Sequence, residues 1–236
     1  MDLQTKRIYE RGLAFYEKGE IAKALSDLES VAMRYPKYAD VHNALGLTYS
    51  MSGRYGKAVQ SFKKAVEINP EYIEAYINLA ISLNELSRFE EAIQAFETAA
   101  KLETKEKGPS PKLRAEIANT YARLGDTYCE LQEYRKARNE YRRALKTCPE
   151  YLDVKTKLAH TYIATKNYKR AVAILKEVVE ANSEYIEAYI ILGLAHYQLG
   201  NNDEAKEAWD KVLAIDHENP KARAYLTMME SNGGSA

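Results

Sequence analysis

Residues 39–72 read ADVHNALGLTYSMSGRYGKAVQSFKKAVEINPEY, and the two halves of this stretch share one pattern. Each half places apolar and small residues three or four positions apart, which is the spacing of one helix face. The SGR segment at 52–54 separates the halves. Two short helices, each with a single apolar stripe, cannot bury that stripe alone, whereas stacked neighbours can. The positions that define the stripes and the end of the unit are Leu45, Gly46, Tyr49, Ala58, Phe62, Ala65 and Pro70.

The same frame recurs along the chain with a period of 34 residues. Small residues on both helices of a unit permit close approach, and a large residue four places after the alanine of the second helix fills the remaining space. We therefore expect a helix–turn–helix in every unit. The predicted units span residues 5–38, 39–72, 73–106, 118–151, 152–185 and 186–219.

An insertion interrupts the period between the third and fourth units. The sequence EYIEAYI occurs at 71–77 and again at 184–190, and the distance between the two copies is longer than three periods. The extra residues are 107–117, KGPSPKLRAEI. Ser110-Pro111 predicts an N-cap and a first helical position. We predict that the insertion lengthens the next helix backward by about two turns and remains an appendage outside the repeat core.

The chain continues beyond the sixth unit. Asn219-Pro220 predicts another helix start, and residues 220–230 carry an apolar stripe of Ala222, Tyr225, Leu226 and Met229. We interpret this segment as a capping helix that covers the last apolar face of a repeat array. The remaining residues, 231–236, read SNGGSA and are typical of a flexible tail.

Composition limits the class of protein. Lys plus Arg and Asp plus Glu both total 34, so no overall field attracts nucleic acid or an anionic membrane. The sequence has no apolar run long enough to span a bilayer and no signal-peptide pattern at its start, so we expect no membrane span. The expected localisation is cytoplasmic, or periplasmic or secreted if a leader has been removed. Cys129 and Cys148 are too few for a disulfide scaffold.

Recognisable catalytic motifs are absent from the sequence. The four histidines are scattered, and His160 and His196, on neighbouring first helices, have no third ligand beside them. Asp126 and Glu130 lie one helical turn apart, where a solvated face is a simpler interpretation than an acid–base pair. We therefore expect a protein that is not an enzyme, with no metal and no cofactor.

The signature L-G-x-x-Y … A-x-x-x-F … P of residues 39–72 resembles the tetratricopeptide repeat. The chain departs from it at Thr104, Ser183 and His217, which stand where the closing proline is expected. The resemblance implies an all-α fold, a right-handed solenoid of six helical hairpins followed by the capping helix. It also implies that the first helix of each unit lines a concave groove, in which the family binds a peptide or helix of a partner protein.

The groove of the first three units contains apolar, amide and acidic residues. Exposed apolar stripes mark interaction surfaces, amides can hydrogen-bond a peptide backbone, and the acidic surplus favours a ligand with basic flanks. In the alternative interpretation, the apolar residues pack between units and the groove is only solvated. The candidate peptide-binding residues are Leu13, Asn43, Leu47, Met51, Glu74, Ile77, Asn78, Ile81, Asn84 and Glu85.

The resemblance also defines where chaperone-binding members of the family hold a terminal carboxylate with Lys, Arg and Asn. Only Asn78 has a suitable side chain at these positions, and Glu74 has the opposite charge. We therefore do not expect this chain to bind the C-terminal carboxylate of a chaperone. The positions are occupied by Tyr9, Leu13, Ala44, Glu74 and Asn78.

A second candidate surface is the predicted helix at 134–146, YRKARNEYRRALK. Its outward positions are basic, and they form either a solvated face or a docking patch for an acidic partner. Nucleic acid is a weaker alternative, because aromatic residues do not interleave with the cations. The possible docking patch comprises Arg135, Lys136, Arg142, Arg143 and Lys146.

Together these observations predict a non-enzymatic adaptor or scaffold that binds another protein in its concave groove. A self-associating structural subunit of a larger assembly is the alternative. We expect a monomer rather than a homo-oligomer, a protein partner, and no membrane or nucleic-acid ligand.

Overall fold

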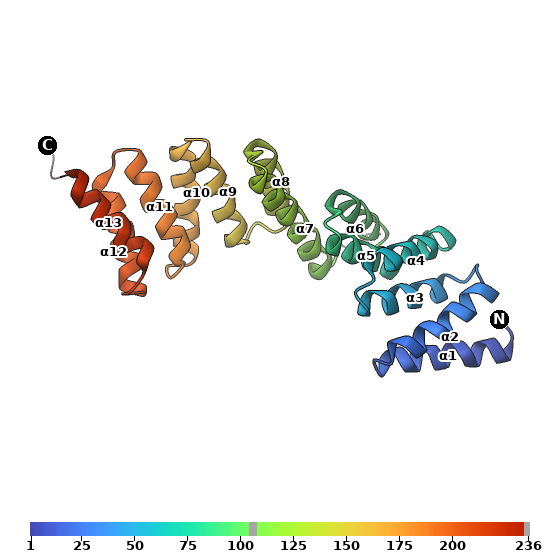
Figure 1. Ribbon diagram of the computed structural model, residues 1–236. Helices are drawn as coiled ribbons and strands as arrows, with labels where there is room; N and C mark the ends of the chain where they lie inside the picture. The colour runs from blue at the N-terminus through green and yellow to red at the C-terminus, as the bar shows by residue number, and fades with distance from the viewer. Residues whose placement is uncertain (104–107, 234–236) are drawn as a thin grey trace. The chain divides into compact units, whose positions relative to one another are not determined.

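The computed structural model describes residues 1–103 and 108–233, which form thirteen helices and no strand (Figure 1). They divide into two compact units, residues 1–120 and 121–236, with the boundary inside α7. The first unit contains α1 (Leu3–Glu17), α2 (Ile21–Arg34), α3 (Ala39–Met51), α4 (Tyr55–Ile68), α5 (Ile73–Glu85), α6 (Phe89–Glu103) and the start of α7 (Pro111–Glu130). The second contains the rest of α7 with α8 (Tyr134–Thr147), α9 (Leu152–Ala164), α10 (Tyr168–Ala181), α11 (Ile186–Gln198), α12 (Asn202–Ile215) and α13 (Pro220–Gly233).

Consecutive helices pack as antiparallel hairpins within each unit, for example α3 with α4 and α11 with α12 (Figure 1). One residue in each hairpin turn has a positive φ, between 55° and 79°. These residues follow one another at intervals of 34, except for an interval of 45 across the insertion, so the backbone reproduces the period read from the sequence. They are Gly19, Gly53, Ser87, Gln132, Lys166 and Gly200.

The helices of a hairpin approach closely where a glycine on the first faces an aromatic ring on the second. A methyl group at the glycine would overlap the ring, because it would lie well inside van der Waals contact. The pairs, with the distance from an added Cβ to the nearest ring atom, are Gly46 with Phe62 (2.5 Å), Gly125 with Tyr141 (2.6 Å) and Gly193 with Trp209 (2.3 Å).

The insertion lengthens α7 as predicted, since this helix has 20 residues whereas α3, α5, α9 and α11 have 13 each. Ser110 Oγ accepts a hydrogen bond from the backbone N–H of Leu113 at 3.4 Å, as an N-cap does. The prediction of an appendage is wrong, however, because Leu113 is 2% exposed and Ile117 is 7% exposed. The added turns continue the apolar stripe and bury it. Residues 104–107 of the predicted third unit and insertion lie outside the described residues.

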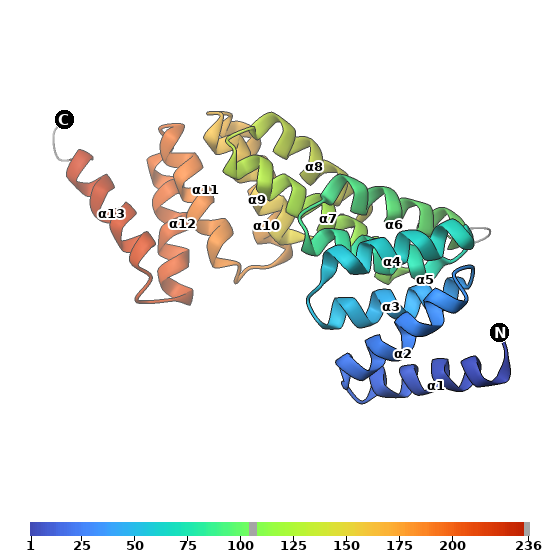
Figure 2. The same cartoon turned by 45° about the vertical axis from the view of Figure 1, so that its right-hand side comes forward.

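Helix α13 packs against α12 at the end of the second unit (Figure 2). Its apolar residues Tyr225, Leu226 and Met229 contact a buried cluster that includes Trp209, and the rings of Tyr225 and Trp209 stack at 5.0 Å. Asn219 Oδ1 accepts from the backbone N–H of Ala222 and begins the helix. The helix ends at Gly233 rather than at the predicted residue 230, so 231–233 do not belong to the tail.

None of the helices in the described ranges combines the length and the apolar composition that a bilayer span requires.

Candidate functional site

The first helices of neighbouring hairpins contact one another, α1 with α3 and α3 with α5 in the first unit, and α9 with α11 in the second. Each unit therefore has a face built from first helices alone. The predicted peptide-binding residues of the first unit lie on these helices. The second unit has equivalent positions, offset along the chain by three periods plus the insertion.

Apolar side chains on the face of the first unit are partly accessible. Met51 is 55% exposed and Ile81 is 40% exposed, whereas Leu13, Leu47 and Ile77 are half-buried. Glu74 and Glu85 are exposed beside them. The face therefore offers two apolar contacts within an acidic surrounding.

Two of the three predicted asparagines form a polar ladder between helices. The Asn78 amide donates to Asn43 Oδ1 at 3.2 Å, and the Asn43 amide donates to the phenol of Tyr72 at 3.3 Å. Because Asn43 is only 9% exposed, its amide mainly joins α3 to α5. Asn78 is half-buried and borders the accessible part of the face.

Asn84 does not lie where the sequence predicted it. It is 6% exposed, and its amide donates to Thr120 Oγ1 at 2.8 Å. Thr120, on the lengthened helix α7, is itself completely buried. Asn84 therefore stabilises the packing of α5 on α7, and a peptide in the groove would not reach its side chain.

Carboxylates surround a half-buried tyrosine on the face of the first unit. Burial, the charge of Asp40 and a hydrogen bond to Asp40 raise the pKa of Tyr72 to about 12, and Glu74 adds to the effect. Burial and the same Asp40 also raise the pKa of Tyr9. Burial is the largest cause of both shifts, and the negative charge of Asp40 adds to it in the same direction, because a neighbouring negative charge favours the neutral phenol. We name Tyr9, Asp40, Tyr72 and Glu74 the first acidic cluster.

The second unit repeats this arrangement, with Asp153, Tyr185 and Glu187 in place of Asp40, Tyr72 and Glu74. Burial and the two carboxylates raise the pKa of Tyr185. A cavity of about 190 Å³ opens here between α7, α9 and α11. We name Asp153, Tyr185 and Glu187 the second acidic cluster. The predicted peptide-binding residues do not include Asp40, Tyr72 or this cluster, although the repeated EYIEAYI contains the tyrosine and the glutamate of both clusters.

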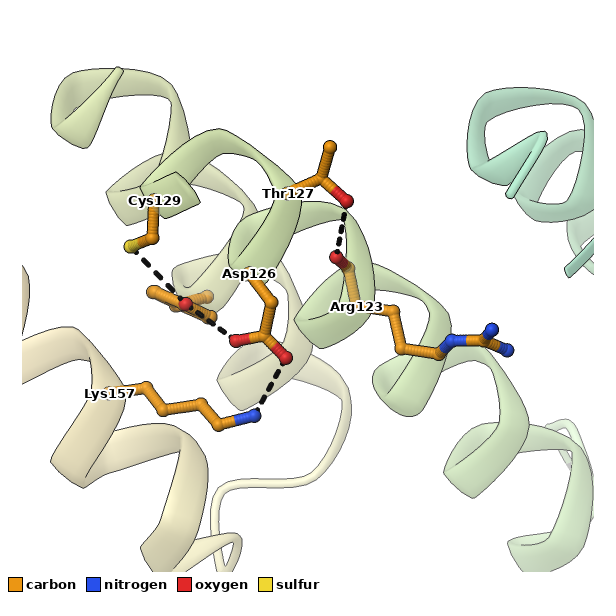
Figure 3. Close-up of polar contacts among 6 residues, drawn as sticks. Arg123, Asp126, Thr127, Cys129 and Lys157 are labelled. Carbon is orange, nitrogen blue, oxygen red and sulfur yellow. Dashed lines mark hydrogen bonds and ion pairs between the residues drawn. The ribbon is translucent and has the colours of Figure 1, made fainter. Parts of the chain in front are cut away.

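Lys157, which lines the cavity, forms an ion pair with Asp126 (Figure 3). Lys157 Nζ lies 2.8 Å from Asp126 Oδ2, and the Tyr141 phenol donates to the other carboxylate oxygen at 2.8 Å. Figure 3 shows Arg123, on the same helix as Asp126, extending in a different direction. Asp126 is therefore neutralised by Lys157 rather than paired with Glu130 as an acid and base.

Cys129 borders the same cavity, where the Tyr141 phenol lies 3.4 Å from its sulfur (Figure 3). Burial raises the pKa of the Cys129 thiol. A raised pKa keeps the sulfur protonated at neutral pH, whereas a nucleophilic cysteine needs a lowered pKa. The arrangement is that of a packed cysteine.

The basic residues predicted on α8 are all exposed, but they are not equivalent. Lys136 pairs with Glu133 at 2.5 Å, and Arg143 pairs with Glu140 at 3.2 Å. Arg142 instead donates to the phenol of Tyr162 on α9. The exposed set is Arg135, Lys136, Arg142, Arg143 and Lys146.

A larger cavity, about 680 Å³, lies on the opposite side of α11, between α10 and α12. His196 lines it, is 6% exposed, and has a pKa lowered mainly by burial. Asn201 Nδ2 lies 3.3 Å from its Nδ1. Within residues 1–103 and 108–233, no three or more His, Cys, Asp or Glu side chains are grouped to hold a metal ion.

Comparison with known proteins extends this description. Residues of the chain are 24% identical over 106 positions to human "DnaJ homolog subfamily C member 7", covering 45% of the chain and 22% of that protein. They are 29% identical over 117 positions to "Small glutamine-rich tetratricopeptide repeat-containing protein 2" of Saccharomyces cerevisiae, covering 50% of the chain and 31% of that protein. The matches thus span less than a third of the length of either relative.

Two solved structures have a similar fold. YrrB, described as a TPR protein with an unusual peptide-binding site, is 16% identical with a TM-score of 0.59, and the match covers 85% of this chain and 97% of YrrB. MamA is 22% identical with a TM-score of 0.53, and the match covers 74% of this chain and 95% of MamA. At these identities the likeness is one of fold.

Models of the tetratricopeptide repeat match residues 39–72, 71–150, 128–182 and 163–228. Together these ranges are continuous from the first helix of the second predicted unit to α13. The matched ranges follow the helical hairpins and the glycine–aromatic pairs that the structure contains. The chain belongs to the tetratricopeptide repeat family.

Proposed function

We propose that this chain is a non-enzymatic protein-interaction scaffold whose first-helix face binds a peptide segment of a partner protein. The ligand carries Lys or Arg beside apolar residues. Membership of a repeat family whose members bind other proteins supports the general role. The match to a peptide-binding neighbour such as YrrB is consistent with it.

The observation that carries the proposal is the juxtaposition of exposed apolar side chains with the first acidic cluster. Met51 and Ile81 keep about half of their surface in water. In the described part of the chain, neither Asp40 nor Glu74 has an ion-pair partner. A peptide that buries the apolar residues and places a cation near Asp40 would satisfy both features at once.

The second acidic cluster supports the same ligand class. Its two carboxylates stand at positions equivalent to those of the first acidic cluster, whereas Thr156 and Ile191 replace Asn43 and Asn78. Both units thus have the negative charges, but only the first has the amides, which favours a ligand recognised by its cations. An acidic C-terminal carboxylate would meet repulsion at both clusters, so we do not propose that chaperone carboxylates bind here.

The test is a peptide library selected on the immobilised chain, followed by affinity measurements with the strongest peptide. We expect selected sequences that combine Lys or Arg with apolar residues. The double variant Met51→Asp/Ile81→Asp should weaken binding by about a hundredfold or more, since each apolar contact contributes ~1.5 kcal/mol or more. Circular dichroism of the variant should match the wild type.

The chain offers a matched control. Met33, on the second helix α2, is 81% exposed, and Leu131, in the turn after α7, is 62% exposed. Neither belongs to the predicted peptide-binding residues of the first unit. The variant Met33→Asp/Leu131→Asp adds the same two negative charges, so any general attraction for a basic peptide increases equally in both variants. Equal affinity of the peptide for the two double variants would refute the groove, and selection of acidic peptides would refute the ligand class.

A further inference from the structure

Three arginines surround one tyrosine in the second unit. The guanidinium carbons of Arg138, Arg142 and Arg170 lie 5.2, 5.9 and 5.8 Å from the centroid of the Tyr162 ring. Tyr162 belongs to α9 and is 4% exposed, whereas the arginines come from α8 and α10. We name these three residues the arginine cluster.

The cluster is held in place by neutral partners. Arg142 donates to the Tyr162 phenol, and Arg138 Nη1 donates to Thr165 Oγ1 at 3.0 Å. None of the three guanidinium groups lies within ion-pair distance of a carboxylate anywhere in residues 1–103 and 108–233. Three positive charges are therefore gathered around one ring without an ion pair to any described carboxylate.

Equivalent positions show that packing of the ring does not require this arrangement. In three other hairpins, the residue at the position of Tyr162 is also aromatic, and the residue eight places later is a lysine. The Nζ atom of that lysine lies over the ring, 5.2 or 5.3 Å from its centroid. A glutamate accompanies each of them: Glu20 pairs with Lys23 over Phe15, Glu29 accepts from the phenol of Tyr49, and Glu133 pairs with Lys136 over Tyr128.

The side chain at position 142 has the opposite charge to its counterpart in the first unit. When the second unit is aligned on the first through the two copies of EYIEAYI, Arg142 corresponds to Glu29 and Tyr162 to Tyr49. Glu29 accepts a hydrogen bond from Tyr49, whereas Arg142 donates one to Tyr162. Arg138 corresponds to Leu25 in the same alignment. In the described residues, the corresponding ring of the first unit, Tyr49, thus has one lysine over it and a glutamate beside it in place of three arginines.

The surface beside the cluster is hollowed. A depression of about 400 Å³ is lined by Arg135, Arg138 and Thr165, and also by Lys136 with its partner Glu133. An acidic side chain placed there would reach Arg138 of the cluster and the neighbouring Arg135, neither of which forms an ion pair within the described residues. The guanidinium fork matches a carboxylate in a bidentate pair, which is stronger than a neutral hydrogen bond.

We propose that the arginine cluster is a docking site for an acidic segment of a partner protein, with several Asp or Glu residues. The charges are spread around a ring and anchored to different oxygens, which suits separate carboxylates along a chain better than one compact phosphate. Single-stranded nucleic acid needs open aromatic faces for stacking, and the arginines cover Tyr162. This site is independent of the groove, because the arginines belong to second helices.

The test uses the full chain and a fluorescein-labelled octaglutamate peptide, measured by fluorescence anisotropy at low and at physiological ionic strength. The triple variant Arg138→Gln/Arg142→Gln/Arg170→Gln should weaken binding by about tenfold or more. The control Lys206→Gln/Lys221→Gln/Arg223→Gln removes three charges elsewhere on the second unit, where Arg223 already pairs with Glu218 at 2.6 Å. It should retain binding within about twofold, since its charges lie outside the cluster.

Three results would overturn the proposal. The first is no binding of octaglutamate to the wild-type chain at low ionic strength, and the second is an equal loss in the two triple variants. The third is tighter binding of a phosphopeptide or an oligonucleotide than of octaglutamate, lost in the same variant, which would assign the cluster to phosphate. A Tyr162→Phe variant keeps the ring, removes the phenol that accepts from Arg142 and should retain binding. It therefore separates the contribution of the arginine charges to binding from that of the phenol.

Discussion

Replacing Gly193 by alanine should destabilise the second unit, although alanine is the better helix former. The new Cβ would lie 2.3 Å from Trp209 Nε1, compared with about 3.5–4 Å for an ordinary contact. The indole cannot move aside easily, because it is completely buried and stacked on Tyr225. A shift of the ring would also lengthen the hydrogen bond from Nε1 to the Ile190 carbonyl, which is already 3.2 Å.

The magnitude follows from three opposing effects. Overpacking a core costs ~1–3 kcal/mol, and weakening the indole hydrogen bond costs ~0.5–1.5 kcal/mol. Removing glycine from a helix interior returns ~1 kcal/mol. The net loss is about 0.5–3.5 kcal/mol, and each kcal/mol lowers the melting midpoint of a chain of this size by ~2–4 °C.

Gly56 provides the matched control, since it also lies in a helix, α4, and an added Cβ there meets nothing within 4 Å. Gly56→Ala should therefore stabilise the protein by about 0.5 kcal/mol. Urea denaturation followed by far-ultraviolet circular dichroism would compare the two variants with the wild type. An unchanged or increased stability of Gly193→Ala would show that the close approach of α11 to Trp209 does not constrain this residue.

Three other predictions concern the insertion, pH and assembly. Leu113→Ala should lower the free energy of unfolding, measured by urea denaturation, by ~2–4 kcal/mol, whereas Lys112→Ala should change it by less than ~0.5 kcal/mol. Equal effects of the two variants would restore the interpretation of the insertion as an appendage. The pKa of Tyr72 and of Tyr49 is raised to about 12, against about 10 in an unfolded chain. The unfolded state therefore loses protons first, and stability should be complete below about pH 10 and fall between about pH 10 and 12. Tyr72→Phe should reduce that fall, and a pH-independent urea midpoint across the window would contradict the assignment. Light scattering should give a mass near 26.8 kDa at all concentrations, whereas growth of the mass with concentration would favour the self-associating subunit.

The helices and the turns between them could be predicted from the sequence, because they depend on the spacing of apolar and turn-forming residues that are close together in the chain. The hairpin turns, the start of α7 at Pro111 and the packing of Tyr225 under the last hairpin all follow from local patterns. The appendage was predicted wrongly because it was inferred from the excess over the repeat period, whereas Leu113 and Ile117 extend the apolar stripe of a longer helix and are buried.

The candidate sites depended on contacts between helices and were harder to predict. Asn84 has a first-helix position, but its burial is decided by Thr120 from the lengthened α7, 36 residues away. The arginine cluster converges from α8 and α10 on a ring of α9. Arg170 therefore lay outside the pattern taken from α8, and Arg138, although on α8, was not among the outward positions of that pattern. The spacing of eight between each aromatic residue and its cation was the available signal.

Trp209 has a further consequence, because it is the only tryptophan of the chain and lies in the second unit. Because Trp209 is completely buried under Tyr225, tryptophan fluorescence, excited selectively over that of the 19 tyrosines, reports on the opening of this unit or the departure of α13. Circular dichroism instead averages the helices of both units. Recording both signals in one denaturation experiment would therefore compare the opening of the second unit with the loss of helix in the whole chain. Coincident transitions would show that the helices on either side of the boundary in α7 unfold cooperatively, in one transition.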